Sequence, residues 1–277
     1  MRIVILGAGT IGLHLARRLI ERGDEVVAIR RSRRPPQARL TWLAADLQRL
    51  EPGSIQGPVD AVVLTVAPGT GDSYAATYPP GARAALALAR HHAAGHLVYT
   101  SSTGVYGERD GGVVTEQSPR HGGPPELLEA EDLLLGAGLP GTTVLRVAGL
   151  YGPGRDPRSR YRDPAHLPNG GRHWVNLVHH DDVAAALEGS LDWSGPPRVL
   201  NVSDGAPTLA SDVCRHLAQA EGRSPAALVS PPTAPSVRSN QRVDVSALRA
   251  TGWTPRYPSF REGFASMDRD GLPAPRR

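Results

Sequence analysis

The chain has 277 residues, 40% of them hydrophobic and 21% charged, which is typical of a soluble globular protein with one large domain, or with a domain and a smaller lobe. Its net charge of +4 comes from dispersed arginines without an aromatic stacking motif, so we expect no nucleic-acid partner, and no apolar run is long enough to span a membrane. The chain has no lysine, which excludes lysine chemistry, and the single Cys214 excludes an intrachain disulfide and favours a cytoplasmic protein.

Strand and helix patterns alternate along the first half of the chain. Strands are predicted at residues 2–6, 25–29, 40–44, 61–66, 96–101 and 142–147. Helices are predicted at 10–22, 82–92 and 126–135, the last of which starts late behind a segment rich in proline and glycine. This alternation predicts an α/β fold, a Rossmann-type doubly wound parallel sheet with helices on both faces.

The second half has a more broken pattern. Residues 152–171 are rich in proline, glycine and arginine, a strand–helix unit follows at 175–191, and a strand is predicted at 198–202. Residues 208–221 and 258–268 are predicted to be helical. We assign 1–152 and 173–204 to a nucleotide-binding domain, and 153–172 and 205–277 to a small C-terminal substrate-binding lobe.

A G-x-G-x-x-G sequence at residues 7–12 follows the first strand and opens the first helix. Gly7 allows the tight turn, Gly9 lets a pyrophosphate approach the backbone, and Gly12 lets helix and strand pack closely. Thr10 and Ile11 start the helix, whose free N–H groups and positive dipole end favour phosphate. The sequence therefore predicts a dinucleotide site.

The residues after the second strand bear on which dinucleotide binds. An NAD-specific site would place Asp or Glu there, to bind the ribose 2′-hydroxyl. This chain has an arginine-rich run at residues 30–34, and Arg30 and Arg31 could pair with a 2′-phosphate. We predict NADP(H) as cofactor, the alternative being an arginine run exposed to solvent.

Several further segments resemble, in order, blocks of the extended and atypical short-chain dehydrogenase/reductases, the NAD-dependent epimerase/dehydratase family. The matching blocks are residues 45–47, 66–68, 99–107, 145–154, 176–184 and 201–204. The resemblance implies a Rossmann domain with substrate bound between two lobes. It also assigns these residues to the cofactor: Asp46, Leu47, Ala67, Pro68 and Thr100.

The chain departs from this family in its catalytic residues. Ser102 matches the family's catalytic Ser/Thr, but Gly123 and Leu127 occupy the positions of its Tyr and Lys. Neither replacement can exchange a proton. The first glycine of the family's loop is also replaced, by Leu6. Candidates for the missing proton donor are Tyr78, His121 and Tyr151; each could instead be structural or simply exposed.

Other polar groups suggest how a substrate is bound. Arg155 and Arg158 belong to an arginine-rich loop that borders the substrate in the family, so we predict a small substrate, with an anionic group as one option; a flexible basic surface loop is the alternative. The adjacent His179 and His180 should point in opposite directions from a strand end, and the chain has no zinc-ligand spacing, so we predict no metal.

Three functions are compatible with these residues. The first is an NADP(H)-dependent oxidoreductase or epimerase-like enzyme acting on a small carbonyl or sugar-like substrate. The second is an NADP(H)-binding regulator without turnover, and the third a non-redox lyase or cyclase that reuses the fold. The resemblance also implies a homodimer through the alanine-rich stretch at 82–94, although a helix packed on the sheet fits that stretch equally well.

Overall fold

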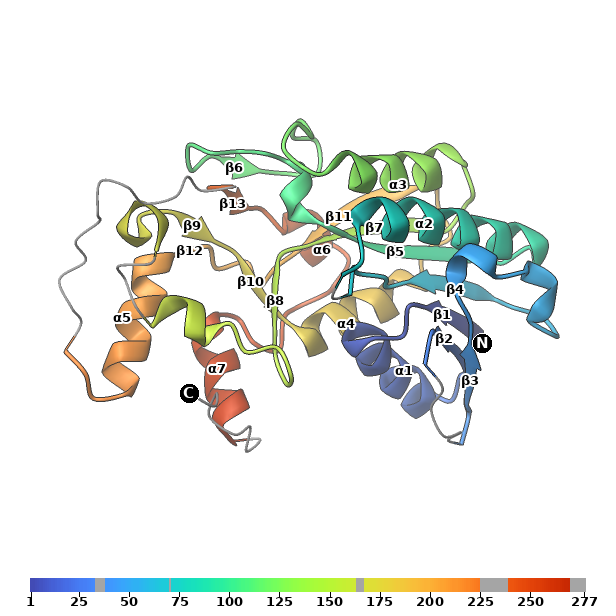
Figure 1. Cartoon of the computed structure of the whole chain (residues 1–277), viewed down its shortest axis with the longest axis horizontal. Coiled ribbons are helices and arrows are strands. Elements are labelled where there is room, and N and C mark those ends of the chain that lie inside the picture. Colours follow the sequence, from blue (N-terminus) through green and yellow to red (C-terminus); the bar gives the residue numbers. More distant parts are fainter. Residues whose placement is uncertain (33–37, 70, 163–166, 225–238, 270–277) are drawn as a thin grey trace. The chain divides into compact units, whose positions relative to one another are not determined.

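The computed structural model describes residues 1–32, 38–69, 71–162, 167–224 and 239–269 (Figure 1). The chain forms two compact units. The first unit comprises Met1–Val105, Gly123–Arg146 and Val183–Leu200. The second comprises Tyr106–Gly122, Val147–Asp182 and Asn201–Arg277. The boundaries of these units differ from those of the two domains predicted above. The assignment of cofactor and substrate binding to those domains remains a prediction.

A seven-stranded parallel sheet forms the centre of the first unit, which confirms the predicted fold class. Its strands are β1 (Arg2–Leu6), β2 (Glu25–Arg30), β3 (Leu40–Ala44), β4 (Ala61–Leu64), β5 (His96–Ser102), β7 (Thr142–Val147) and β11 (Arg198–Val202). Their order is β11-β7-β5-β4-β1-β2-β3, so the chain runs outward in opposite directions from β1 and β4. In such sheets, ligands bind at this switch point, beyond the carboxyl ends of the strands.

Helices cover both faces of the sheet, with α2 and α3 on one side and α1 and α4 on the other (Figure 1). Their bounds are α1 Thr10–Arg22, α2 Tyr74–His91, α3 Pro125–Gly136 and α4 His180–Ser190. The predicted start of α2 at residue 82 is wrong. The helix starts eight residues earlier because the Ser73 hydroxyl caps it, accepting a 3.1 Å hydrogen bond from the Ala76 N–H.

Among its described residues, the second unit contains short strand pairs and the α-helices α5, α6 and α7. Parallel pairs join β6 (Val113–Val114) to β13 (Arg242–Val243) and β8 (Gly149–Tyr151) to β10 (Leu177–His179). An antiparallel pair joins β9 (Trp174–Val175) to β12 (Thr208–Leu209). The helices are α5 (Ala210–Ala220), α6 (Ser246–Arg249) and α7 (Phe260–Arg269).

The core of the second unit lies where α5 and α7 meet β8 and β10. It comprises Tyr151, Leu177, Val213, Leu217, Phe260, Phe264 and Met267. Beside it, the thiol of Cys214 packs in a smaller cluster with Leu167 and Ala210. In both clusters α5 supplies one apolar stripe, so its opposite, polar stripe faces away from the core.

None of the helices in the described ranges is long and apolar enough to cross a membrane.

Candidate functional site

The glycine loop lies at the switch point of the sheet, and the surroundings of each glycine fit the role predicted for it. Gly7 has a φ of +80°, and a Cβ there would lie 2.6 Å from a Val66 methyl group. A Cβ at Gly12 would lie 3.0 Å from the Thr65 hydroxyl and 3.1 Å from Ile5. These two positions tolerate no side chain because strand and helix pack there.

Gly9 has open space around it. A Cβ there would meet no atom closer than 3.8 Å, and its φ of −82° is accessible to other residues. Neither local packing nor backbone conformation therefore requires glycine at this position. A ligand that touches the backbone does require it, so the structure leaves at Gly9 the cradle that a pyrophosphate needs.

The N-terminus of α1 adds positive potential to this cradle. Gly9 caps the helix without a side-chain hydrogen bond, and the first turn has no acidic residue. The first-turn N–H groups, starting at Thr10, Ile11 and Gly12, have no partner within a helix and point toward the loop. This set of donors fits the diphosphate of a dinucleotide.

Arg30 is the last residue of β2, one residue beyond the predicted end of the strand, and Arg31 follows it and is bound to a carboxylate. Its guanidinium donates to both carboxylate oxygens of Asp72, at 3.2 and 2.7 Å. Asp72 also accepts a 3.1 Å hydrogen bond from the Gly69 N–H, and Arg31 holds the pKa of the Asp72 carboxyl below its usual range. The side chain of Arg31 remains 71% exposed, so a phosphate can reach it.

The remaining cofactor candidates lie just beyond other strand ends. Asp46 caps the short helical turn that begins at Leu47, with its carboxylate accepting a 3.1 Å hydrogen bond from the Gln48 N–H. Ala67 and Pro68 follow β4, and Ala67 is exposed. Thr100 lies in β5 and donates a 3.3 Å hydrogen bond to the Leu64 carbonyl. Parallel register brings the carboxyl ends of β3, β4 and β5 to the same edge of the sheet as those of β1 and β2.

Ser102, the candidate catalytic serine, ends β5 at the same edge. Its hydroxyl is half-buried and accepts a 3.1 Å hydrogen bond from the Gly104 N–H, which leaves its own proton available for a substrate oxygen. Its neighbour Ser101 points the other way and donates a 2.6 Å hydrogen bond to Glu131. Alternation along the strand thus separates a solvent-facing from a core-facing hydroxyl.

A buried ion pair anchors the strand end that carries Ser102. The Arg146 guanidinium of β7 donates to Glu131 of α3 at 2.8 Å, and the two side chains are only 3% and 0% exposed. The Ser101 hydroxyl completes this network. Because this network fixes β5, β7 and α3 to one another, it also fixes the position of Ser102 at the end of β5.

The family's tyrosine and lysine positions have no room for such side chains. A Cβ on Gly123 would lie 2.8 Å from the Val105 Cα and 3.2 Å from the Gly104 carbonyl. Leu127 is 4% exposed and belongs to the apolar face of α3. Backbone atoms therefore pack against Gly123, and Leu127 makes a core contact of α3.

The three candidate proton donors differ in exposure. His121 is exposed and Tyr78 is 9% exposed in α2, with its ring edge-on to Tyr74 at 5.2 Å. Tyr151 is fully buried between His179 and Phe264, and its hydroxyl has no hydrogen-bond partner among the described residues. Burial raises the pKa of Tyr151, so we do not retain it as a proton donor.

The two candidate substrate-binding arginines also differ. Arg155 is exposed, and only its backbone is fixed, through hydrogen bonds with Gly152. Arg158 is 13% exposed and pairs with Asp156 at 2.8 Å and with Asp268 at 2.5 Å. Two carboxylates already balance its charge, so Arg155 is the better anion ligand of the two.

His179 and His180 are both buried, and the prediction that they point in opposite directions is wrong. Their ring centroids lie 6.1 Å apart, and a Cβ on Gly152 would lie 3.1 Å from His179 and 2.9 Å from His180. Strand alternation ends at His179 because His180 already starts α4. Within the described ranges, no three His, Cys, Asp or Glu residues gather in a way that could hold a metal ion.

Two buried carboxyl groups of the second unit have raised pKa values. Burial raises the pKa of Asp204 to about 7 and that of Asp182 to about 6; the Asp182 carboxylate adds to the first shift and the Asp181 carboxylate to the second. Asp182 accepts backbone hydrogen bonds from Arg256 at 2.6 Å and Tyr257 at 3.2 Å. These bonds tie the segment before α7 to the start of α4, which is a structural role.

Comparison with known proteins gives the family. Residues 7–192 match the NAD(P)H-binding family, a span that starts at the first glycine of the loop. The chain belongs to the NAD(P)H-binding family. Protein YeeZ of Escherichia coli K12 is 34% identical over 202 residues, which cover 67% of this chain and 71% of YeeZ.

Solved structures place this NAD(P)H-binding chain among the epimerase/dehydratases and confirm the resemblance seen in the sequence. A candidate NAD-dependent epimerase/dehydratase from Methylobacillus flagellatus has a TM-score of 0.80 and 30% identity, covering 97% of this chain and 98% of its own. MoeE5, solved with UDP-glucuronic acid and NAD, has a TM-score of 0.79 and 26% identity, covering 98% and 99%.

Sequence reasoning missed the partners of its own candidates. Asp72 was not connected with Arg31, although both follow strands that flank β1. The pairing of Glu131 with Arg146 was not predicted either. Each is a charged residue among apolar neighbours, Glu131 in α3 and Arg146 in β7, and this pattern could have identified the pair.

Proposed function

We propose that this protein is an NADP(H)-dependent oxidoreductase or epimerase-like enzyme that acts on a small carbonyl or sugar-like substrate. The observation that carries the proposal is the loop at residues 7–12. Gly7 and Gly12 are glycine because of packing, whereas the open space at Gly9 has no explanation within the fold and fits a bound pyrophosphate.

The preference for NADP(H) rests on Arg30 and Arg31. Guanidinium groups pair with a phosphate in a bidentate manner, and no Asp or Glu directly follows β2 to bind a plain ribose. Arg31 is exposed enough to bind a ligand. MoeE5 was solved with NAD, so the preference needs its own measurement.

A bound nicotinamide would supply the hydride acceptor or donor at its C4 atom. The residues of this chain would bind and orient: Ser102 would donate its hydroxyl proton to the substrate oxygen, while the Gly104 N–H fixes the direction of that hydroxyl. Arg155 would bind an anionic group of the substrate. Tyr78 and His121 remain the candidates for proton exchange, and His121 is the more accessible to solvent.

One observation favours a second function, that of an NADP(H)-binding regulator without turnover. Gly123 packs against the Val105 backbone and Leu127 lies in the core, so the usual acid–base pair is replaced by structural contacts. The two functions share the cofactor site and differ in turnover. A panel of carbonyl substrates assayed with NADPH separates them.

The decisive experiment removes the open space at Gly9. Gly9→Val should leave the unfolding midpoint unchanged and abolish calorimetric binding of NADPH and NADH alike. Gly189→Ala is the control, because its added methyl group likewise has open space, with no atom within 4 Å, but lies in α4, far along the chain from the loop. Normal cofactor binding by Gly9→Val would refute the proposed site.

A cytoplasmic location and a homodimer remain predictions from the sequence. Much of the 82–94 stretch is buried within its own chain, including Ala82, Ala85 and Ala89, where α2 packs on β4, β5 and α3. Any dimer interface on α2 would therefore have to use the exposed face of this helix. Sedimentation analysis of the full chain tests this prediction.

A further inference from the structure

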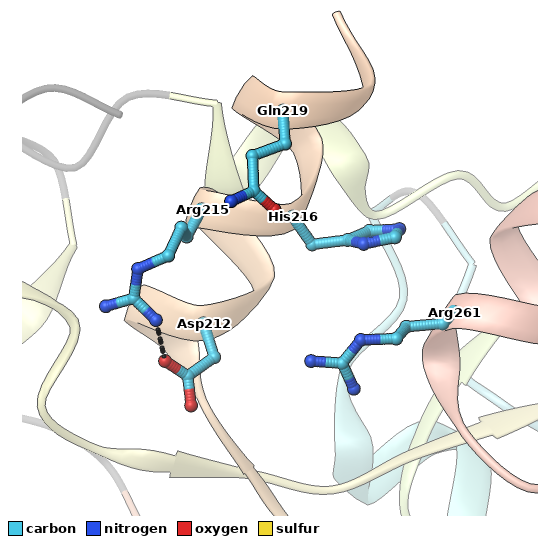
Figure 2. Close-up of a pocket in the computed structure, with 5 residues that line it drawn as sticks. All are labelled: Asp212, Arg215, His216, Gln219 and Arg261. Atoms are coloured by element: carbon cyan, nitrogen blue, oxygen red, sulfur yellow. Dashed lines mark hydrogen bonds and ion pairs between the residues drawn. The ribbon is translucent and has the colours of Figure 1, made fainter. Parts of the chain in front are cut away.

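A pocket of about 210 Å³ in the second unit has no role in the function proposed above (Figure 2). The polar stripe of α5 supplies four of its residues, at spacings of three and four: Asp212, Arg215, His216 and Gln219. Arg261 of α7 supplies the fifth. Such a volume suits a ligand much smaller than a dinucleotide.

One buried aromatic ring holds two of the pocket's side chains in place. The Arg261 guanidinium lies over the Phe260 ring, 4.7 Å from its centroid, and the His216 imidazole meets the same ring edge-on at 5.3 Å. Phe260 is 1% exposed and belongs to the core of the second unit. The two groups are therefore preorganised on a rigid support, which lowers the entropy lost on binding.

Positive charges outnumber negative ones among the residues that line the pocket. Arg215 donates to Asp212 at 2.5 Å, so these two side chains balance each other and fix their orientation (Figure 2). Arg261 adds a second positive charge from the opposite side. The carboxylate next to it in sequence, Glu262, accepts a hydrogen bond from the Ser259 hydroxyl at 2.5 Å and does not line the pocket.

We propose that this pocket binds inorganic phosphate or a small phosphate monoester through Arg215, His216, Gln219 and Arg261. Donors from two helices approach from different directions, which suits a tetrahedral oxyanion better than a planar carboxylate. The Gln219 amide can donate to a further oxygen. All five residues belong to the second unit, whereas the glycine loop belongs to the first.

The test is a titration of the full chain with inorganic phosphate, glycerol 3-phosphate and succinate at constant ionic strength, followed by calorimetry and by the NMR signals of the His216 ring. His216→Gln assigns those signals. We expect saturable binding of phosphate with a Kd on the order of 1 mM. Tighter binding of the ester would identify an organic phosphate as the ligand, and equal or tighter binding of succinate would overturn the proposal.

Arg261→Gln should weaken phosphate binding about tenfold, because it removes a charge-assisted hydrogen bond. Arg215→Gln is the second variant, in case Arg261→Gln changes the fold. The matched control is Arg256→Gln, since Arg256 also lies over an aromatic ring, 5.4 Å from the Tyr257 centroid, but outside the pocket. A lack of saturation in the parent protein, or an equal loss in the control, would overturn the proposal.

The His216 signals also test where the anion binds. Burial and the nearby Arg261 lower the pKa of His216, while Glu262 acts in the opposite direction; Asp212 and Arg215 line the same pocket. A phosphate dianion bound beside the ring should raise this pKa. An unchanged His216 titration at saturating phosphate would show that the anion binds elsewhere.

Discussion

Arg31 and Asp72 connect the loop after β2 to the loop after β4, and β1 lies between those two strands in the sheet. Their hydrogen bonds therefore cross the carboxyl end of β1, where the glycine loop begins. A 2′-phosphate that binds Arg31 has to share this guanidinium with Asp72 or displace it. The pair is exposed, so it contributes little to stability by itself.

Cofactor preference should therefore change in opposite directions in two variants. Arg31→Gln should weaken NADPH binding about tenfold and leave NADH binding unchanged, since only the phosphate contact is lost. Asp72→Asn should strengthen NADPH binding up to about fivefold, because the competing carboxylate is removed. Calorimetric titration with both cofactors measures the ratio of the Kd for NADH to the Kd for NADPH.

The exposed pair Arg83–Glu129, at 3.0 Å between α2 and α3, provides the control. Arg83→Gln removes the same charge away from the strand ends and should not change the ratio. If Arg31→Gln weakened NADH and NADPH binding equally, the assignment of Arg31 to the 2′-phosphate would be wrong.

Restoring the family's catalytic pair should not restore its chemistry. Gly123→Ala already brings a methyl group within 2.8 Å of the Val105 Cα, so we expect a loss of about 1–3 kcal/mol in the free energy of unfolding. Gly123→Tyr with Leu127→Lys should lose more, because it also places a charge in the core. Urea denaturation measures both.

Gly136→Ala is the control for these variants. Gly136 is the last residue of α3, the helix that follows Gly123, and a Cβ there meets nothing within 4 Å, so alanine should be neutral or stabilise by up to about 1 kcal/mol. A double variant that folds normally and reduces carbonyl substrates would contradict the packing argument.

The buried pair of Glu131 and Arg146 should be essential for folding stability. Glu131→Gln leaves the Arg146 guanidinium buried without its counter-charge, and we expect a loss of about 3–5 kcal/mol. Glu129→Gln, two residues earlier on the exposed side of α3, should change stability by less than about 1 kcal/mol. Similar urea midpoints for the two variants would show that the buried pair adds no more than the surface one.

Stability should depend on pH through Asp204. Its pKa is raised to about 7 in the folded protein, compared with the ordinary value of 3.8 that we take for the unfolded chain, so between these values the folded state binds a proton that the unfolded chain does not. The free energy of unfolding should thus fall as pH rises from about 4 to 7, by at most about 4 kcal/mol from this group.

Asp204→Asn removes this titration while keeping an oxygen that can accept the 2.9 Å hydrogen bond from the Ala206 N–H. Urea denaturation at several pH values should show a flatter profile for the variant than for the parent. Parallel profiles would mean that Asp204 does not titrate in this range. Asp182, with a pKa of about 6, would still contribute to both profiles.

The first unit could be predicted closely because its signals are local. Runs of apolar and β-branched residues mark the strands, and β1, β3 and β7 were predicted to the residue. The start of α2 was missed because Pro79 and Pro80 lie inside the helix, where proline is normally unfavourable.

Pairings between distant residues could not be predicted in this way. Nothing near Arg31 in the sequence indicates Asp72, which lies 41 positions away. The pocket on α5 was missed for a different reason: polar residues at spacings of three and four normally mark a solvent-exposed helix face. Only the tertiary structure brings Arg261 opposite that face.

The burial of Cys214 has a practical consequence. As the chain's single thiol, it can react with a labelling reagent only after α5, which carries both Cys214 and Ala210, moves away from Leu167. The rate of alkylation under native conditions therefore measures local opening of the second unit alone. No engineered probe is needed, and a ligand that binds between α5 and α7 should slow the reaction.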